Sequence, residues 1–453
     1  MEKNWETHKL WNTILTKLTN TLFVLFTIFH KLPLKSGKFL GLSIVVGLRH
    51  IAMIIIKILN HKIAPEFPSL IELSATAQQI DLRLQQFCYS PIQYIRTTRK
   101  IDWNATSLAH MQSPVENSLS IEQYPEYIRF YNTLWLVIND VTLGAITGAV
   151  LIENQEILIK VFNEIIVSKI LYEDLKKISM WLMNSPGGIK LNNELSMFFS
   201  ELFTWMIEFW NVSLVDTLVP NLSTVFYILA LSSTFGATLS IAIFSDFLSI
   251  ITFNIYCFYF ASARIFNWQL DILASLFHLF CGQKKNILRN RIDSNDYDLD
   301  QLLLGTLLFT VLIFLLPTVF AFYLTFTITR LSILVIVGSL EFVMSCLNHF
   351  PIFVILLRLK DYRRTPGGIE FENEEDYLRI KSKPLEVSEM FKPFSNVIDK
   401  LKSSYFSFKT LKKILTGFPI NVQRNKFYKL LYSALPSNHI STSELWSETK
   451  KFL

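Results

Sequence analysis

The residues best suited to chemistry lie in one short acidic string. Asp296-Tyr-Asp298 and Asp298-Leu-Asp300 each place two carboxylates two positions apart, a pattern with which many sugar-transferring enzymes hold a metal ion and UDP. Carboxylate oxygens suit Mg²⁺ or Mn²⁺. No nucleotide-binding β-α-β pattern surrounds the string, which abuts a long apolar segment. We therefore favour a structural role, in which the acids pair with Arg289 and Arg291 or cap the next helix.

A second set of polar residues stands alone in otherwise apolar stretches. These residues are Asn139, Asp140, Asp246 and Glu341. A proton or ion pathway needs such side chains inside a membrane, and so does close contact between helices. Isolated examples favour helix–helix contact, with a small transporter or channel as the alternative class.

The remaining residue types indicate no catalytic, cofactor or metal site. The four cysteines are far apart and form no CxxC pair or Cys/His cluster, so neither a disulfide framework nor a zinc site is predicted. The net charge of +6 is concentrated in the tail, where residues 358–453 hold 18 Lys or Arg against 11 Asp or Glu. No nucleic-acid-binding module accompanies this charge, so nucleic acid is not an expected partner.

Two long apolar blocks must position these residues. Hydrophobic residues make up 51% of the chain and charged residues only 18%. Blocks 222–265 and 302–357 would be about 66 and 84 Å long as helices, and a bilayer core is about 30 Å thick. The sequence therefore predicts two crossings per block, the first breaking near Asp246 and the second, kinked at Pro317, breaking near Arg330. With a good candidate at Leu134–Ile152 and two weaker apolar stretches within residues 1–60, five to eight spans are expected.

Charge gives the expected orientation. The connector 267–301 and the tail are both rich in Lys and Arg, and cytoplasmic loops retain these residues. Two crossings between them would return the chain to the same side. We therefore expect both segments in the cytoplasm.

Amphipathic helices are expected beside the spans. Glu194, Glu201 and Glu208 recur every seven residues along 191–210, which places them on one helix face. This face could meet a basic partner or be solvated.

A further helix is predicted in the tail, where apolar residues recur at helical spacing between Pro393 and Gly417. It could be a cationic helix at the membrane interface or could dock on a partner. Turns are predicted at Pro186–Gly188 and Pro366–Gly368, since glycine adopts positive φ.

The acidic string also carries a family resemblance. The segments that carry it are Arg291–Gln301, the following Leu302–Thr318, and Trp135–Asp140, Ser185–Asn192, Phe253–Tyr259 and Pro366–Phe371. Taken in their order along the chain, from about Tyr131 to Glu372, they resemble the PIG-Q family, a subunit of the phosphatidylinositol N-acetylglucosaminyltransferase that begins glycosylphosphatidylinositol (GPI) anchor synthesis.

The resemblance and the composition together predict an all-α, polytopic transmembrane protein with amphipathic interfacial helices and a basic cytoplasmic tail. Residues 1–130 would form an N-terminal region with one or two membrane-associated helices and a polar segment. Residues 131–372 would form the PIG-Q-like membrane core, and residues 373–453 the basic tail with its amphipathic helix.

The resemblance implies a non-catalytic subunit of the endoplasmic-reticulum membrane. Its complex transfers N-acetylglucosamine from UDP-GlcNAc to phosphatidylinositol, and the active site belongs to a PIG-A-like partner. The other implied partners are PIG-C, PIG-H, PIG-P and PIG-Y-like subunits, with membrane lipids including phosphatidylinositol. An autonomous glycosyltransferase is the third possibility. The string is the candidate partner-docking site, with residues Arg289, Arg291, Asp293, Asp296, Tyr297, Asp298, Asp300 and Gln301.

Overall fold

The computed structural model describes most of the chain between residues 35 and 418. The described ranges are 35–62, 67–98, 124–184, 186–286, 291–361, 365–374, 377–405 and 408–418. Predictions that concern residues 1–34 and 419–453, and the candidate docking residue Arg289, lie outside them.

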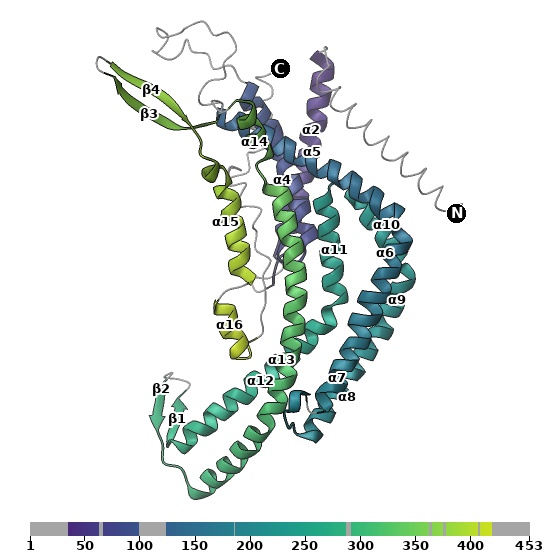
Figure 1. The fold of residues 1–453 in the computed structure, drawn as a ribbon, viewed down its shortest axis with the longest axis vertical. Helices are drawn as coiled ribbons and strands as arrows, with labels where there is room; N and C mark the ends of the chain where they lie inside the picture. The colour runs from purple at the N-terminus through teal and green to yellow at the C-terminus, as the bar shows by residue number, and fades with distance from the viewer. Residues whose placement is uncertain are drawn as a thin grey trace.

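The described residues are mostly helical, and the helices follow one another with short connections (Figure 1). The first are α2 (Lys35–Asn60), α3 (Leu70–Leu73), α4 (Ala75–Thr98) and α5 (Tyr124–Glu153). Two long helical runs follow, made of α6 (Gln155–Val161), η3 (Phe162–Asp174) and α7 (Leu175–Met183), then α8 (Asn193–Trp210), η5 (Asn211–Val215), α9 (Asp216–Leu218), η6 (Val219–Asn221) and α10 (Leu222–Ser233). The last are α11 (Ala237–Ile251), α12 (Phe253–Phe280), α13 (Leu299–His349), α14 (Ile352–Lys360), α15 (Val387–Tyr405) and α16 (Phe408–Leu415).

The two helical runs form a curved arm beside α13 (Figure 1). The turn at its end is η4 (Pro186–Gly188), in which Gly187 and Gly188 have φ of 61° and 78°. The predicted glycine turn is therefore confirmed here. Serines let α7 and α8 approach closely, because Ser179 and Ser200 lie 3.0 Å apart through their hydroxyls.

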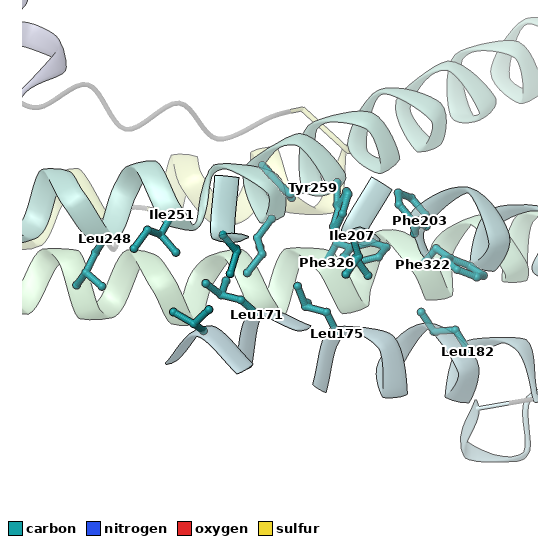
Figure 2. Packing of buried hydrophobic residues seen from close by; sticks show 14 of the residues in the cluster. Leu171, Leu175, Leu182, Phe203, Ile207, Leu248, Ile251, Tyr259, Phe322 and Phe326 are labelled. Atoms are coloured by element: carbon teal, nitrogen blue, oxygen red, sulfur yellow. The ribbon is translucent and has the colours of Figure 1, made fainter. Parts of the chain in front are cut away.

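An aromatic core joins this arm to α12 and α13. The Phe203 ring lies 4.5 Å from Phe326 and 5.3 Å from Phe258, measured between centroids. Phe322 packs beside them, and Leu175 and Leu182 of α7 close the other side of the cluster (Figure 2). Such aromatic pairs stabilise packing beyond the area they bury.

Helix α13 corrects the prediction for block 302–357. It runs without a break for 51 residues, with Pro317 inside it, and is about 76 Å long. The expected break near Arg330 is wrong. The Arg330 guanidinium instead lies over the Tyr256 ring, 5.0 Å from its centroid, so α12 accommodates this cation on the side of a continuous helix.

The breaks in block 222–265 also differ from the prediction. They fall between α10 and α11 at Gly236, whose φ of 145° suits glycine, and between α11 and α12 at Thr252. Asp246 lies within α11, away from both breaks.

The described helices that are long and apolar enough to cross a membrane are fewer than expected. They cover Phe130–Glu153, Asn193–Ser233 and Leu299–His349. A fourth would be the pair Ala237–Ile251 and Phe253–Phe280, bent by 52°, if the pair is one span. The prediction of five to eight spans is therefore too high for the described residues, partly because block 302–357 forms one long helix in place of the two crossings expected there. The chain is a membrane protein by the length and composition of these helices.

Two antiparallel β-hairpins make the all-α prediction incomplete. Strands β1 (Gln283–Asn286) and β2 (Arg291–Ser294) form the first, and β3 (Pro366–Glu374) and β4 (Tyr377–Pro384) the second. The turn predicted at Pro366–Gly368 is wrong, because these residues begin β3. The residues after them alternate between apolar and charged, Ile369-Glu-Phe-Glu372, which is the period of a strand.

The tail returns along α13 after the second hairpin (Figure 1). Phe391 and Phe394 of α15 pack on Phe350, with centroids 5.6 and 6.0 Å away. The expected single helix is two helices, α15 and α16. Gly417, with φ of 70°, follows the second as predicted.

Candidate functional site

A buried polar junction joins α4, α5, α11 and α13. Its centre is Asp140 of α5, whose side chain is 1% exposed. Arg83 of α4 forms an ion pair with Asp140, with Nη2 and Oδ2 2.5 Å apart. Thr238 of α11 donates its backbone N–H to Oδ1 at 2.9 Å and its hydroxyl to Oδ2 at 2.8 Å. Nη2 of Arg83 also lies 3.3 Å from Oδ1 of Asn348 on α13.

Asp140 caps the N-terminus of α11. A carboxylate is favoured there because the first backbone N–H groups of a helix have no partner within the helix. Gly236 makes the approach possible, since a Cβ at this position would lie 2.1 Å from Oδ2 of Asp140. Gly144, one turn further along α5, similarly leaves room for the backbone around Ser233. The two glycines let α5 approach the α10–α11 break.

Asp246 forms a second cap, between α11 and α4. Its carboxylate accepts the backbone N–H groups of Ala75 and Thr76 at 3.0 and 2.9 Å. The hydroxyls of Ser74 and Thr76 donate to it at 2.5 and 2.8 Å. Helix α11 is thus capped by α5 and itself caps α4. These two acids hold three helices in a fixed relation.

The other two residues predicted for intramembrane contacts lie outside these caps. Asn139 is half-buried on α5, and no hydrogen bond from its side chain is found among the described residues. Glu341 is half-buried on α13, two turns before Asn348. The structure therefore brings Asp140 and Asp246 into the same assembly of helices, and places Asn139 and Glu341 beside it.

The sequence interpretation missed α4 altogether. Gln79, Arg83 and Gln86 stand four and three residues apart in a segment that reads as polar and soluble, and this spacing puts them on one helix face. Arg83 donates to Gln86 at 2.9 Å, and Asn348 donates to Gln79 at 2.8 Å. The helical spacing of these three polar residues is the feature of the sequence that could have predicted α4 and its contact with other helices.

The acidic string lies at the junction of the first hairpin and α13. Arg291 pairs with Asp293 across 2.6 Å on β2. The Tyr297 hydroxyl donates to the backbone carbonyl of Gln283 on β1 at 3.1 Å. These contacts attach the string to the hairpin, which connects α12 to α13.

The remaining acids of the string are exposed. Asp298 occupies the N-cap position of α13 and Asp300 lies in its first turn, while Asp296 precedes them and Gln301 follows. Acids at this end of a helix are favoured by its dipole. Among the described residues, no three His, Cys, Asp or Glu side chains lie together as a metal ion would require.

The end of the tail helix α16 is fixed in the angle between α12 and α13. The Tyr323 hydroxyl donates to the carbonyl of Ile414 at 2.6 Å, and the Asn267 amide donates to the carbonyl of Thr416 at 2.9 Å. Gly417 lies so close to α12 that any side chain there would collide with it. These bonds satisfy carbonyl groups at the C-terminus of α16, which the helix itself leaves unpaired.

Together these features define a membrane-embedded helical protein that uses buried carboxylates to join helices and presents a charged hairpin directly before the start of α13, the longest of the described helices. Residues 77–367 match the protein family described as N-acetylglucosaminyl transferase component (Gpi1). That match includes Asp140 with its cap, Asp246, the acidic string and α13, whereas residues 74–76, which bond to Asp246, lie just before it. The chain belongs to the Gpi1 family.

Individual relatives agree. The chain is 42% identical to the phosphatidylinositol N-acetylglucosaminyltransferase subunit GPI1 of Saccharomyces cerevisiae, over 93% of this chain and 70% of the relative. It is 38% identical to the N-acetylglucosaminyl-phosphatidylinositol biosynthetic protein gpi1 of Schizosaccharomyces pombe, over 88% of this chain and 61% of the relative. It is 35% identical to subunit Q of the mouse transferase, over 60% of this chain and 46% of the relative. No solved structure matches the chain.

Proposed function

We propose that this chain is a non-catalytic membrane subunit of the complex that transfers N-acetylglucosamine from UDP-GlcNAc to phosphatidylinositol, the first step of GPI anchor synthesis. Membership of the Gpi1 family carries the proposal, because the matched relatives are named for this transferase or for this biosynthesis. The chain would hold a PIG-A-like catalytic subunit and the PIG-C, PIG-H, PIG-P and PIG-Y-like subunits at one membrane surface. Its contribution to the rate would be proximity of the two substrates.

The polar contacts support a scaffold. Asp140 and Asp246 accept hydrogen bonds from backbone and side-chain groups of neighbouring helices, so these acids stabilise the assembly of α4, α5 and α11. A rigid arrangement of helices is what a subunit needs in order to keep partners in a fixed geometry.

The acidic string is the proposed docking site for the catalytic subunit. Asp296, Asp298 and Asp300 are exposed at the start of α13, where they can pair with Lys or Arg of a partner. Replacing all three with Asn should lower recovery of the catalytic subunit without unfolding the chain. Unchanged assembly and activity would show that the string does not dock this partner.

The endoplasmic-reticulum membrane is the proposed location, with the connector 267–301 and the tail on the cytoplasmic side. The excess of Lys and Arg in the tail supports this side. The two crossings expected in block 302–357 do not support this side, because α13 is one continuous helix. Asn267, which lies within α12, donates to Thr416 in the tail, so α12 and the end of the tail helix α16 lie together.

The regional division is part of the same proposal. Residues 131–372 would be the membrane core, with the N-terminal region 1–130 packed on it through α4 and the tail 373–453 returning along α13. Exposed Lys412 and Lys413 on α16 would give that amphipathic helix a cationic side toward anionic lipid, including phosphatidylinositol.

One assay tests the function. The complex is purified with and without this chain, and the chain is purified alone; transfer from UDP-GlcNAc to phosphatidylinositol is then measured. We expect no transfer by the isolated chain, and loss of both activity and subunit co-purification when it is absent. Transfer by the isolated chain, or an intact and active complex without it, would refute the proposal.

A further inference from the structure

The second hairpin projects from the helical body, and its base is firmly attached (Figure 1). Leu385, directly after β4, donates its N–H to the carbonyl of Thr365, directly before β3, at 2.8 Å. Arg358 of α14 donates to the carbonyl of Leu385. The hairpin is therefore held in a defined direction by α14, although its two strands extend beyond the body.

One side of this hairpin is apolar and exposed. Phe371 pairs with Ile380 across the two strands, and Ile369 lies two residues before Phe371, so the three side chains share one face. Their exposed fractions are 65% for Ile369, 64% for Phe371 and 65% for Ile380. We call these three residues the apolar face.

The opposite side is charged. Glu370 pairs in register with Lys381, and Glu372 with Arg379. The Lys381 ammonium also forms an ion pair with Glu372 at 2.5 Å. Charged side chains are well solvated by water, whereas the apolar face exposes hydrophobic side chains to it.

A two-stranded hairpin by itself is at best marginally stable in water, and a third strand or a packed helix is needed for independent stability. Within the described residues, no helix packs broadly against either strand. We propose that the apolar face and the adjoining strand edge dock on a folded, sheet-containing domain of another subunit of the transferase complex. This inference rests on the proposed function, since it needs such a complex.

The strand edges favour protein over lipid as the occupant. Strands of nine and eight residues leave a long row of main-chain N–H and C=O groups on each outer edge. Another strand can pair with such an edge, as in recognition by strand addition. The hydrocarbon of a bilayer offers those groups no partner. A partner sheet can therefore satisfy the edge and cover the apolar face together.

Photo-crosslinking in the assembled complex tests the contact directly. A photo-reactive amino acid replaces Phe371 in the full chain, and the matched control places it at Glu370 on the charged side. We expect position 371 to crosslink to an identified subunit of the transferase, at least tenfold more than position 370. Crosslinking to lipid, to a second copy of this chain, or equally from both positions would overturn the proposal.

A variant measures what the contact contributes. F371T and I380T together remove two of the three residues of the apolar face and replace them with threonine, a β-branched residue that favours strands; Glu370→Gln is the control. We expect the double variant to lower recovery of the crosslinked subunit at least tenfold, with the control unchanged. If the wild-type chain assembles and the double variant assembles equally well, the hairpin inference fails while the proposed function stands. If the wild-type chain joins no complex, the proposed function itself fails.

Discussion

The cap between α5 and α11 makes the sharpest test of the reasoning. The change is Asp140→Asn, which keeps the size of the side chain and an oxygen for the N–H of Thr238 but removes the negative charge. Arg83 then loses its ion-pair partner, whose Oδ2 lies 2.5 Å from Nη2. The loss therefore falls mainly on the attachment of α4 to α5.

The expected cost follows from burial. Removing one partner of a buried ion pair costs about 3–5 kcal/mol. Because the Arg83 side chain is 22% exposed, water screens part of the ion-pair energy. We expect the lower end, about 3 kcal/mol. The entropy of unfolding is about 2.1 cal/mol/K per residue, so for a chain of 453 residues a loss of about 3 kcal/mol lowers the midpoint of thermal unfolding by about 3 °C.

The assay heats the detergent-solubilised chain in steps and measures the monodisperse fraction that remains by size-exclusion chromatography. Asn139→Ala is the matched control, because Asn139 is the neighbouring polar residue on the same helix and lies outside the cap. Its midpoint should stay near that of the wild type. An Asp140→Asn midpoint no lower than that of Asn139→Ala would refute the assignment of Asp140 as a cap that holds these helices together.

Three further predictions concern other parts of the fold. Gly236→Ala puts a Cβ 2.1 Å from the capping carboxylate at a φ of 145° and should cost at least about 2 kcal/mol in the same thermal assay, whereas Gly47→Ala, which meets no atom within 4 Å, should change stability by less than about 1 kcal/mol. Tyr323→Phe removes the hydrogen bond to the Ile414 carbonyl of α16 and should lower the free energy needed to detach the tail by about 1 kcal/mol. Tryptic cleavage of the tail should then be about fivefold faster. Tyr227→Phe on α10 is the control and should leave that rate unchanged. Exposed Cys281, with the other three cysteines replaced by serine, should react with a membrane-impermeant maleimide in sealed vesicles whose cytoplasmic side faces out. Labelling only after permeabilisation would contradict the proposed orientation.

The two apolar blocks could be predicted from the sequence because hydrophobicity is a local property of the residues. Their internal breaks were not, because a break depends on what lies beside the helix. At Arg330 the ring of Tyr256 provides a favourable contact for the cation, so α13 continues through a charge that insertion scales would place at a span end. At Gly236 the single glycine of block 222–265 marks the break, but no pattern within the block indicates that the carboxylate of Asp140 fills the space beside it.

The polar residues show the same limit more clearly. Asp140 and Asp246 stood out because carboxylates are rare in apolar segments. Apart from Thr238, however, their partners come from residues 74–83, which no hydrophobic pattern marks. Such contacts depend on tertiary packing across 57 to 172 positions of sequence. The second hairpin was missed for the opposite reason: Pro366-Gly-Gly suggested a turn, although the period-two pattern after it indicated a strand.

An unbroken α13 also changes what a scaffold of this kind can do. The acidic string lies at the start of this helix, and the second hairpin is mounted on α14 directly beyond its end. The helix is about 76 Å long, whereas a soluble domain of 150 residues has a radius of gyration of about 15 Å. One domain of that size cannot reach both surfaces. If both are docking sites, they hold different domains, and α13 determines the distance between them.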